Sequence, residues 1–494
     1  MKPSWKKRKL KADIKRSNHL KHQLKKAPTF EKWQETAEEL DKILGHDEWK
    51  RTPTSHLYDN ETIEADIRKL RKERSSGNQR ALMHYIRQGL HRNRGNIGNP
   101  ALYEFCFTGT KYLLDDYIKE VIQCLNYITD SNDDVVDIES KIGFIANTQQ
   151  SFGKSSLLLS GGANLGVFHI GVAKALWQRG LLPRVLSGAS AGSVVAALLG
   201  TLPDNQLPYL FDTKKLPFDT WKRLPFQEIL STKAAFCAPT LKRKLKFFLR
   251  NMTFAEAYEK TGRIINISVT NADRYNDPKL LNYLTTPHVL IWSACLASCA
   301  MFGLYPAAEL MQKDSKGKIV PYMPGKLWLD GSLRNDLPKE RLAELYNINN
   351  YIVSQANPYI IPFLSDPASR GKLHNFLGSL VYGELNLRLK QMGFILTETN
   401  QVPSLVSLVD TISAVVQQQY HGDITLYPRV NLAMYRQLFS NLPQKKVNEL
   451  VLQGERAVWD KLNFIQNQTK IAQTLDRCLR RLKNPGKWIT DTAI

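Results

Sequence analysis

The amino-acid sequence predicts an α/β unit, built as a three-layer α/β/α sandwich, with all-α regions before and after it. Residues 156–192 have the pattern strand, glycine turn, helix, strand and serine turn. A unit of this kind builds a parallel sheet, and helices must then cover both of its faces. Residues 29–145, and those beyond 365, instead carry apolar residues at helical spacing.

With 494 residues, the chain exceeds one average domain. Changes in charge and in hydrophobic period predict its division. We expect a basic arm (1–28), disordered or amphipathic, then an all-α domain (29–145), an α/β domain (151–365) and a C-terminal helical region (366–494).

The formal net charge of +22 is concentrated at the N-terminus. The first 26 residues carry 11 Lys or Arg against Asp13, which gives +10 and leaves +12 for the remainder. No zinc-ligand spacing or other nucleic-acid-binding signature accompanies this charge, so we expect no nucleic acid partner. An anionic lipid surface fits better, with the arm as an amphipathic helix whose apolar residues insert into lipid. A solvated basic tail is the alternative.

The six cysteines are scattered and indicate no disulfide framework. No apolar segment follows the basic residues of the N-terminus, so the N-terminus does not resemble a secretory signal peptide. We therefore expect an intracellular, cytoplasmic protein, and the basic charge favours peripheral attachment to a lipid surface, either a membrane or a lipid droplet.

Helix signals come first along the chain. Thr29 can cap a helix whose apolar residues recur every three or four positions up to Leu44, and Gly45 can end it. Further helices are predicted at about 61–74 and 79–91, followed by a long one that includes residues 113–125.

The strand–helix–strand unit follows, with strands at 156–160 and 184–187 and a helix at about 167–179. Ser190 lies between Gly188 and Gly192 at the second strand-to-helix junction. Small neighbours permit the strained turn that exposes a nucleophilic hydroxyl at the edge of a sheet. Ser190 is therefore the candidate nucleophile.

The first turn exposes backbone amides at a helix N-terminus. Such amides can bind a phosphate or stabilise the oxyanion formed when a serine attacks an ester. A dinucleotide site is disfavoured because no Asp or Glu lies between Gly161 and Ser190, and no Gly-Lys-Ser/Thr closes a phosphate loop. The candidate oxyanion hole consists of Gly161, Gly162, Ala163 and Asn164.

An apolar run that ends in Asp330-Gly331-Ser332 puts a carboxylate at a strand tip. Taken alone, an Asp-Gly turn is equally well explained as structure. Combined with the glycine turn and Ser190, it indicates a catalytic carboxylate.

In this order, the three motifs resemble those of the patatin-like phospholipase family. The resemblance implies a Ser190–Asp330 dyad, without histidine, metal or organic cofactor. Ala163 departs from the commonest form of the loop, which has a third glycine there, but still supplies an amide. A triad with His288, His374 or His421 as base stays open, whereas His169, beside the loop, is expected to be structural.

The resemblance extends over about residues 29–430. Residues 91–100 and 109–112 look like the helical domain that precedes the patatin module in yeast lipid-droplet and plant oil-body triacylglycerol lipases, and residues 330–338, 353–358 and 421–425 are similar to the same group. The resemblance implies a lipid acyl-ester hydrolase, with triacylglycerol as the expected substrate. A phospholipase A or lysophospholipase is the alternative, and a non-catalytic lipid-surface scaffold is the alternative of another class.

Two further stretches complete the chain. Val289–Ala308 is 20 residues long and has no charge, but its small residues, Gly303 and Pro306 favour a buried helix of about 14 residues, which starts at Thr286-Pro287, over a membrane span. Beyond Pro362 we expect no strands. Helices are expected at 373–392, 402–420, 430–442 and 447–482.

Overall fold

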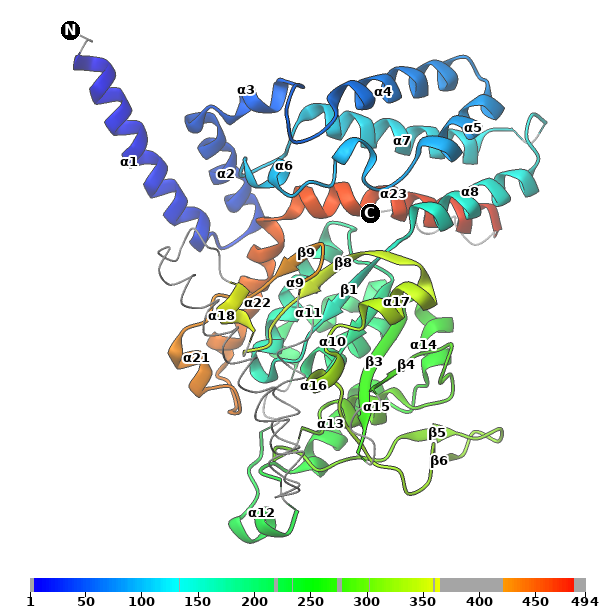
Figure 1. Ribbon diagram of the computed structural model, residues 1–494. Helices are drawn as coiled ribbons and strands as arrows, with labels where there is room; N and C mark the ends of the chain where they lie inside the picture. Colours follow the sequence, from blue (N-terminus) through cyan, green and yellow to red (C-terminus); the bar gives the residue numbers. More distant parts are fainter. Residues whose placement is uncertain are drawn as a thin grey trace, which may run out of the picture.

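The computed structural model describes residues 4–132, 134–216, 221–232, 234–272, 278–301, 303–358, 360–364 and 421–483. These residues form a layer of helices over an α/β unit, and the helix α23 (Leu462–Lys483) runs along the boundary between the two (Figure 1). The predicted combination of a sandwich with all-α flanks is confirmed for this part of the chain.

The N-terminal layer contains the predicted helices. Thr29 caps α2 by accepting a hydrogen bond from the amide of Lys32, and Gly45 ends α2 at φ +76°. The last helix of this layer continues beyond residue 145, where the predicted all-α domain ends. The helices are α1 (Ser4–Lys26), α2 (Phe30–Leu44), α3 (His46–Arg51), α4 (Asn60–Ser75), α5 (Gln79–Gly89), η1 (Arg94–Asn96), α6 (Ala101–Glu104), α7 (Tyr112–Asp130) and α8 (Ile138–Phe152).

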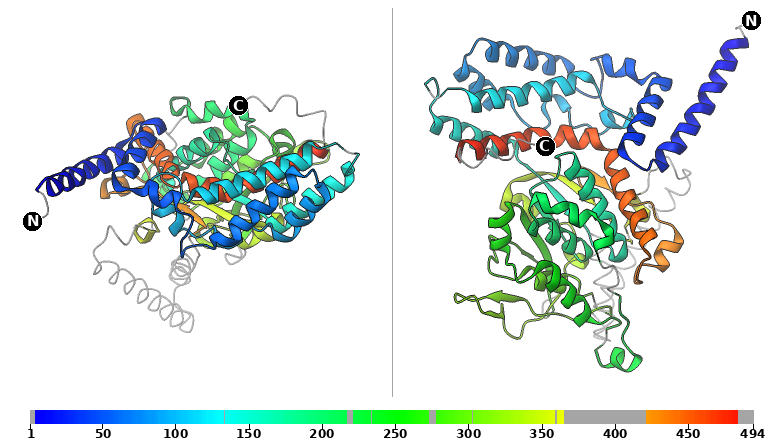
Figure 2. Two further views of the ribbon diagram at one scale, coloured as in Figure 1. Left: turned by 90° about the horizontal axis from the view of Figure 1, so that it is seen from above. Right: turned by 180° about the vertical axis from the view of Figure 1, so that it is seen from behind.

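Helix α1 projects from the body of the molecule (Figures 1 and 2). From Lys11 onward its lysine and arginine side chains are exposed, but Leu20 and Leu24 are buried where α1 packs on α2. Of the described apolar side chains of α1, Ile14 is the large one left exposed. The prediction that these leucines insert into lipid is therefore wrong, because α2 covers them.

One sheet organises the α/β unit, and its strands run in the order β4-β3-β2-β1-β8-β9, with β7 paired to β3. Strands β1, β2, β3, β8 and β9 are parallel to their neighbours, whereas β4 and β7 are antiparallel to β3. The strands are β1 (Lys154–Leu159), β2 (Val185–Gly188), β3 (Ile264–Asn271), β4 (Pro278–Leu281), β7 (Trp328–Asp330), β8 (Ile348–Ser354) and β9 (Ile424–Leu426); β5 (Met311–Lys313) and β6 (Ile319–Pro321) form a separate hairpin.

Alternate residues of β1 reach opposite cores. Leu157 and Leu159 join the cluster that contains α9 (Phe168–Gln178), α10 (Ala191–Thr201) and α22 (Gln444–Trp459). Leu158 points to the other face and joins α17 (Lys339–Tyr346). Burial of both faces explains why the strand reads as a continuous apolar run.

The remaining helices surround this sheet. A third core cluster packs α13, α14 and α15 against β3. These helices and the shorter segments are η2 (Ala163–Val167), η3 (Asp204–Gln206), α11 (Leu207–Phe211), η4 (Thr213–Lys215), α12 (Phe226–Thr232), α13 (Ala238–Leu249), α14 (Phe254–Thr261), α15 (Ile291–Ser298), α16 (Ser332–Asn335), α18 (Ile361–Leu364) and α21 (Leu432–Arg436).

The C-terminal region differs from its prediction. Its strand β9 extends the sheet beside β8, so strands do not cease at Pro362. Helix α22 lies on α9 so closely that a Cβ on Gly171 would be 1.8 Å from the carbonyl oxygen of Val451. The predicted helix 447–482 is two helices, α22 and α23, and 430–442 contains only α21. The helices predicted at 373–392 and 402–420 lie outside the described residues.

The charge-free stretch is also less helical than predicted. Helix α15 begins at Ile291 and ends at Ser298, because the preceding residues extend along the β5–β6 hairpin, where Val289 bridges to Gln312. Within the described residues, no helix is long and apolar enough to span a membrane.

Candidate active site

Ser190 lies at the turn from β2 into α10 with φ +50° and ψ −124°. This conformation is sterically costly for any residue with a Cβ. Two glycines make the turn possible, since a Cβ on Gly188 would lie 2.3 Å from the carbonyl oxygen of Gly192, and a Cβ on Gly192 would lie 2.1 Å from that of Leu159. The predicted serine turn therefore exists, and contact with neighbouring backbone explains both glycines.

Helix α15 holds this turn in place through a hydrogen bond with Ser298. The amide of Ser190 donates a hydrogen bond of 2.9 Å to the hydroxyl of Ser298, and that hydroxyl donates at 2.8 Å to the carbonyl oxygen of Ser268 on β3. Ser298 was not identified from the sequence, where it is one small residue among many. Its position fixes the elbow to the central sheet.

Asp330 ends β7 and is fully buried. Its Oδ1 accepts the amide of Ser332 at 2.8 Å. Burial raises the pKa of Asp330 to about 6, and the hydrogen bond from Ser332 and the nearby Ser190 side chain oppose this shift. Among the described residues, Oδ2 has no hydrogen-bond partner. We interpret the Ser190–Asp330 contact as proximity without a formed hydrogen bond, as is common before substrate binds.

The glycine loop packs on Ser190 and on Ser332, which follows Asp330 by two residues. A Cβ on Gly161 would lie 3.1 Å from the Cβ of Ser332 and 3.4 Å from that of Ser190. Ala163 has φ +47°, in the left-handed region that favours glycine, which gives a physical reason for the glycine common at this position of the motif. The loop, the elbow and the Asp330 strand thus converge, as the three motifs predict.

The amides of this loop fall into two groups. The amide of Gly161 donates to Oδ1 of Asp336 at 2.8 Å, and that of Asn164 donates to the carbonyl oxygen of Leu438 at 3.2 Å. Among the described residues, the amides of Gly162 and Ala163 have no acceptor. The candidate oxyanion donors are therefore narrowed from four amides to these two.

Asp336 was not singled out from the sequence, although it lies only six residues after Asp330. It is buried, and burial together with the charge of Asp330 raises its pKa to about 8. Its hydrogen bond to Gly161 joins the glycine loop to the chain segment that follows Asp330. Asp336 is therefore a positioning residue, and a conservative substitution can test it.

Replacing Asp336 with leucine is expected to cost about 1–3 kcal/mol of unfolding free energy, because the buried Gly161 amide loses its acceptor. It should also lower kcat more than it changes KM, since the loop loses its anchor. Asp336→Asn keeps an acceptor oxygen and should retain most of the activity. Steady-state kinetics with a soluble ester and thermal unfolding measure both effects. Equal kcat for the leucine and native proteins would exclude the positioning role.

The raised pKa of Asp336 also predicts how the stability of the protein depends on pH. Because its pKa is raised in the folded protein, its contribution to stability is complete below its usual pKa and is lost as the pH rises through about 8. The native protein should therefore lose stability as the pH rises from about 4 to about 8, and Asp336→Asn should lose less over this range.

Among the described residues, no histidine lines the cavity beside Ser190. His169 is buried, its ring lies 2.7 Å from the hydroxyl of Ser354 and 3.0 Å from the carbonyl oxygen of Ser160, and burial lowers its pKa to about 4. His288 and His421 are exposed, and neither lines the cavity beside Ser190. His374 lies outside the described residues.

A largely apolar cavity of about 260 Å³ opens beside Ser190 and the glycine loop. Its walls come from α10, α13 and the segment that includes Tyr305, and the C-terminal region adds Phe439. Trp221 joins this wall and donates its ring N–H to the side chain of Asn164 at 2.7 Å. An apolar chain attached to a reacting carbonyl fits such a cavity.

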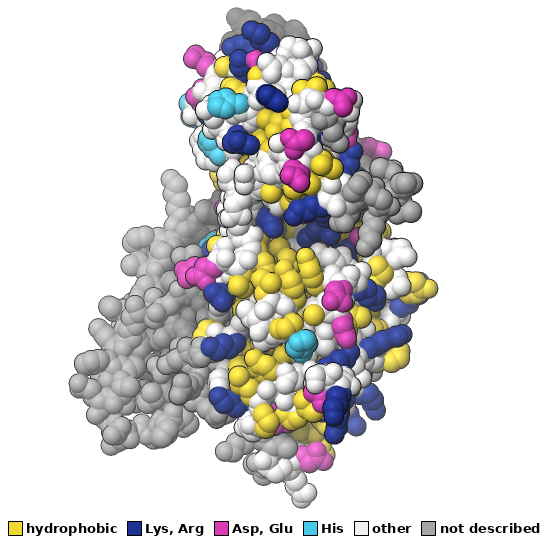
Figure 3. Space-filling model, turned by 90° about the vertical axis from the view of Figure 1, so that its right-hand side faces the viewer, with side chains coloured by type: hydrophobic (Ala, Val, Ile, Leu, Met, Phe, Trp, Pro, Cys, Tyr) yellow, Lys and Arg dark blue, Asp and Glu magenta, His cyan; other side chains and the backbone are white. Residues whose placement is uncertain are grey.

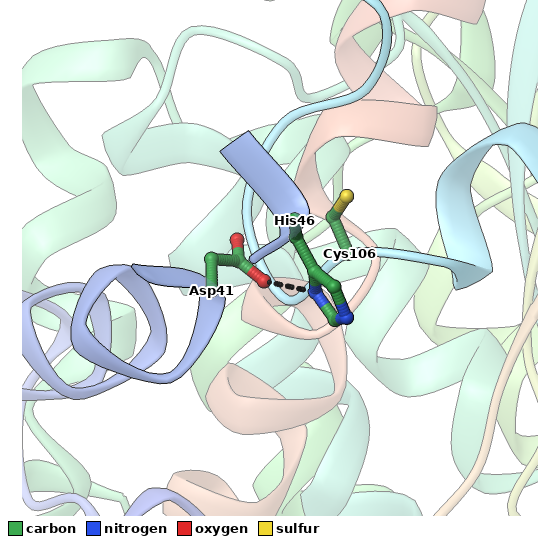
Figure 4. A group of neighbouring side chains, drawn as sticks. All are labelled: Asp41, His46 and Cys106. Atoms are coloured by element: carbon green, nitrogen blue, oxygen red, sulfur yellow. Dashed lines mark hydrogen bonds and ion pairs between the residues drawn. The ribbon is translucent and has the colours of Figure 1, made fainter. Parts of the chain in front are cut away.

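One cluster elsewhere has metal-ligand residue types: Asp41, His46 and Cys106 (Figure 4). The two oxygens of Asp41 already accept hydrogen bonds from His46, Lys50, Phe107 and Thr108. Burial raises the pKa of Cys106 to about 12, so its thiol stays protonated. A cation would have to displace the Lys50 ammonium, and the cluster therefore fits a structural network rather than a metal centre.

Comparison with known proteins gives two family matches and curated relatives. The family model for patatin-like phospholipase matches residues 157–342, and the model for a domain of unknown function, DUF3336, matches residues 9–150. Triacylglycerol lipase SDP1L of Arabidopsis thaliana is 34% identical over 94% of this chain, which spans 60% of that protein. Triacylglycerol lipase ptl3 of Schizosaccharomyces pombe is 32% identical over 94% of this chain and 99% of its own length. Among solved structures, VipD from Legionella pneumophila matches 66% of this chain and 67% of its own, at 14% identity and a TM-score of 0.32, which is too low to support an argument.

Proposed function

This chain belongs to the patatin-like phospholipase family, and on that premise we propose that it hydrolyses acyl esters of lipids, with triacylglycerol as the main substrate. One observation carries the proposal. A serine in a strained elbow, a buried carboxylate close to it and two amides that have no acceptor in the described part of the chain meet at an apolar cavity. These are the parts that serine ester hydrolysis requires.

In the proposed mechanism Asp330 is the general base. At neutral pH a carboxyl with a pKa near 6 is mostly ionised, and its raised pKa makes it a stronger base than an ordinary aspartate. Asp330 removes the hydroxyl proton as the Ser190 oxygen attacks the ester carbonyl. The amides of Gly162 and Ala163 donate to the oxyanion, a contribution typically worth about 3–4 kcal/mol for one donor.

Collapse of the tetrahedral intermediate breaks the ester bond, and Asp330 returns its proton to the departing alcohol. Water, deprotonated by the same carboxylate, then attacks the acyl-enzyme. The fatty acid leaves and Ser190 regains its proton. Every proton moves between Asp330, Ser190, water and substrate, so these steps balance without a cofactor.

The relatives and the cavity support the proposed substrate class. Two curated relatives are named triacylglycerol lipases, and one of them matches over nearly its full length. At about 260 Å³ the cavity is smaller than the usual 300–1,000 Å³ of sites that enclose a drug-sized ligand. It therefore suits the reacting ester and part of one acyl chain, while the rest of the lipid stays outside.

We further propose peripheral association with a membrane or lipid-droplet surface inside the cell. On the face shown in Figure 3, lysine and arginine side chains are frequent over the α/β unit, whereas the helical layer carries acidic side chains among its basic ones. Together with a net charge of +22, this distribution favours an anionic surface.

Two substrates test the assignment. The purified protein is expected to release fatty acid from emulsified triolein with a higher kcat/KM than from phosphatidylcholine vesicles, measured by titration of the released acid. Cleavage of the phospholipid alone would replace the triacylglycerol assignment with a phospholipase. An absence of hydrolysis of any ester, soluble esters included, would favour the scaffold alternative.

A further inference from the structure

A groove rich in basic and aromatic residues lies beside the catalytic cavity. It shares Leu216, Lys244 and Phe248 with that cavity, so the two are continuous. We call it the basic groove. Its lining residues are Lys214, Lys215, Leu216, Arg243, Lys244, Phe247 and Phe248.

Helix α13 forms one side of this groove and has two distinct faces. Leu241, Leu245 and Leu249 are buried in the core. The outward side carries Arg243 and Phe247, and Phe247 is 76% exposed. A single exposed phenylalanine needs no partner. Here, however, it lies among cations at the mouth of an apolar cavity, which is the pattern of a lipid-binding surface.

Two of the four cations that line the groove have no ion-pair partner among the described residues. Lys214 and Lys215 on η4 and Arg243 on α13 are all exposed. Lys215 pairs with Asp212 at 3.2 Å, whereas neither Lys214 nor Arg243 forms an ion pair with any described residue. An anion supplied from outside would complete this arrangement.

We propose that the basic groove is the face by which the protein docks on a phospholipid surface with anionic headgroups, with Phe247 inserted and the cavity mouth against the lipid. The proposal rests on the proposed function, because docking here brings the ester to Ser190 without its passing through water. It also places the contact away from α1, whose leucines Leu20 and Leu24 are covered by α2.

The test uses three variants of the full chain. The first removes the three cations (Lys214→Ala, Lys215→Ala, Arg243→Ala) and the second is Phe247→Ala. The control removes three exposed cations of the helical layer (Lys72→Ala, Arg80→Ala, Lys119→Ala), so it has the same net charge as the first. In Figure 1 their helices α4, α5 and α7 lie far from α13.

Flotation with vesicles of phosphatidylcholine, with and without phosphatidylserine, measures docking. The native protein should float with the anionic vesicles, and its partition coefficient should fall as salt is added. Loss of three cations near the surface should lower that coefficient on the order of 100-fold, whereas the control should lower it much less. Phe247→Ala should weaken binding to both kinds of vesicle.

Hydrolysis of a soluble short-chain ester separates docking from catalysis. The groove variants should turn it over like the native protein, which shows that they fold, and should lose activity on emulsified triolein. Equal flotation of the groove and control variants would overturn the proposal, as would a change in oligomeric state alone, which would assign the groove to a second copy of the chain. If no ester is hydrolysed but flotation depends on the groove, docking stands and the proposed function falls.

Discussion

Replacing Ser190 with alanine is expected to lower kcat for ester hydrolysis by a factor on the order of 10⁴ to 10⁶, because the acyl-enzyme can no longer form. The fold should persist, since the elbow depends on Gly188 and Gly192 and on the hydrogen bond to Ser298, none of which involves the Ser190 hydroxyl. Rates with a soluble ester and covalent labelling by a fluorophosphonate measure the effect.

Ser190→Gly provides a matched control for this variant. It should be equally inactive, but it removes the Cβ from a residue at φ +50° and should raise the unfolding free energy by about 1–2 kcal/mol. Alanine retains the Cβ and should give no such gain. Native-like turnover by Ser190→Ala would assign the nucleophile to another residue.

Replacing Asp330 with asparagine is expected to lower kcat roughly 10²- to 10⁴-fold, the usual contribution of a positioned general base. In the native protein the pKa of Asp330 predicts that kcat/KM rises with pH and levels off above about 6. In the variant, kcat/KM should no longer rise with pH in this range. A pH–rate profile from about 4.5 to 8.5 with a soluble ester is the measurement.

The same substitution should stabilise the protein at neutral pH. The pKa of Asp330 is raised in the folded state, so its stabilising contribution is complete below about 4 and is lost as the pH rises through about 6. Asp330→Asn avoids this loss. Its melting temperature should therefore exceed that of the native protein at pH 8, and the difference should diminish towards pH 4. A lower melting temperature at pH 8 would contradict the assignment of Asp330 as a buried, destabilised base.

The parts of the site that could be predicted depend on local sequence. A glycine on each side of Ser190 indicates the elbow because the turn excludes every other side chain at those positions. Asp330 could be placed because an apolar run ends at an Asp-Gly pair. Likewise, the cap at Thr29 and the stop at Gly45 depend only on nearby backbone, and both were predicted correctly.

The parts that could not be predicted depend on contacts between distant segments. Strand β9 is three residues long and forms only because β8 offers an open edge. The anchor at Asp336 appears only when its carboxyl meets the Gly161 amide, 175 residues away in the chain. Similarly, the start of α15 was placed too early because the pairing of Val289 with the hairpin leaves no periodic signal.

The carbonyl oxygen of Leu438 holds the amide of Asn164, and Phe439 closes part of the cavity wall. During translation, Leu438 is added to the chain 248 residues after Ser190. A nascent chain that already displays its nucleophile therefore still lacks a wall of its cavity and a restraint on its oxyanion loop. Ester hydrolysis should accordingly begin only late in translation. A chain truncated before residue 421 should contain Ser190 but have no hydrolase activity.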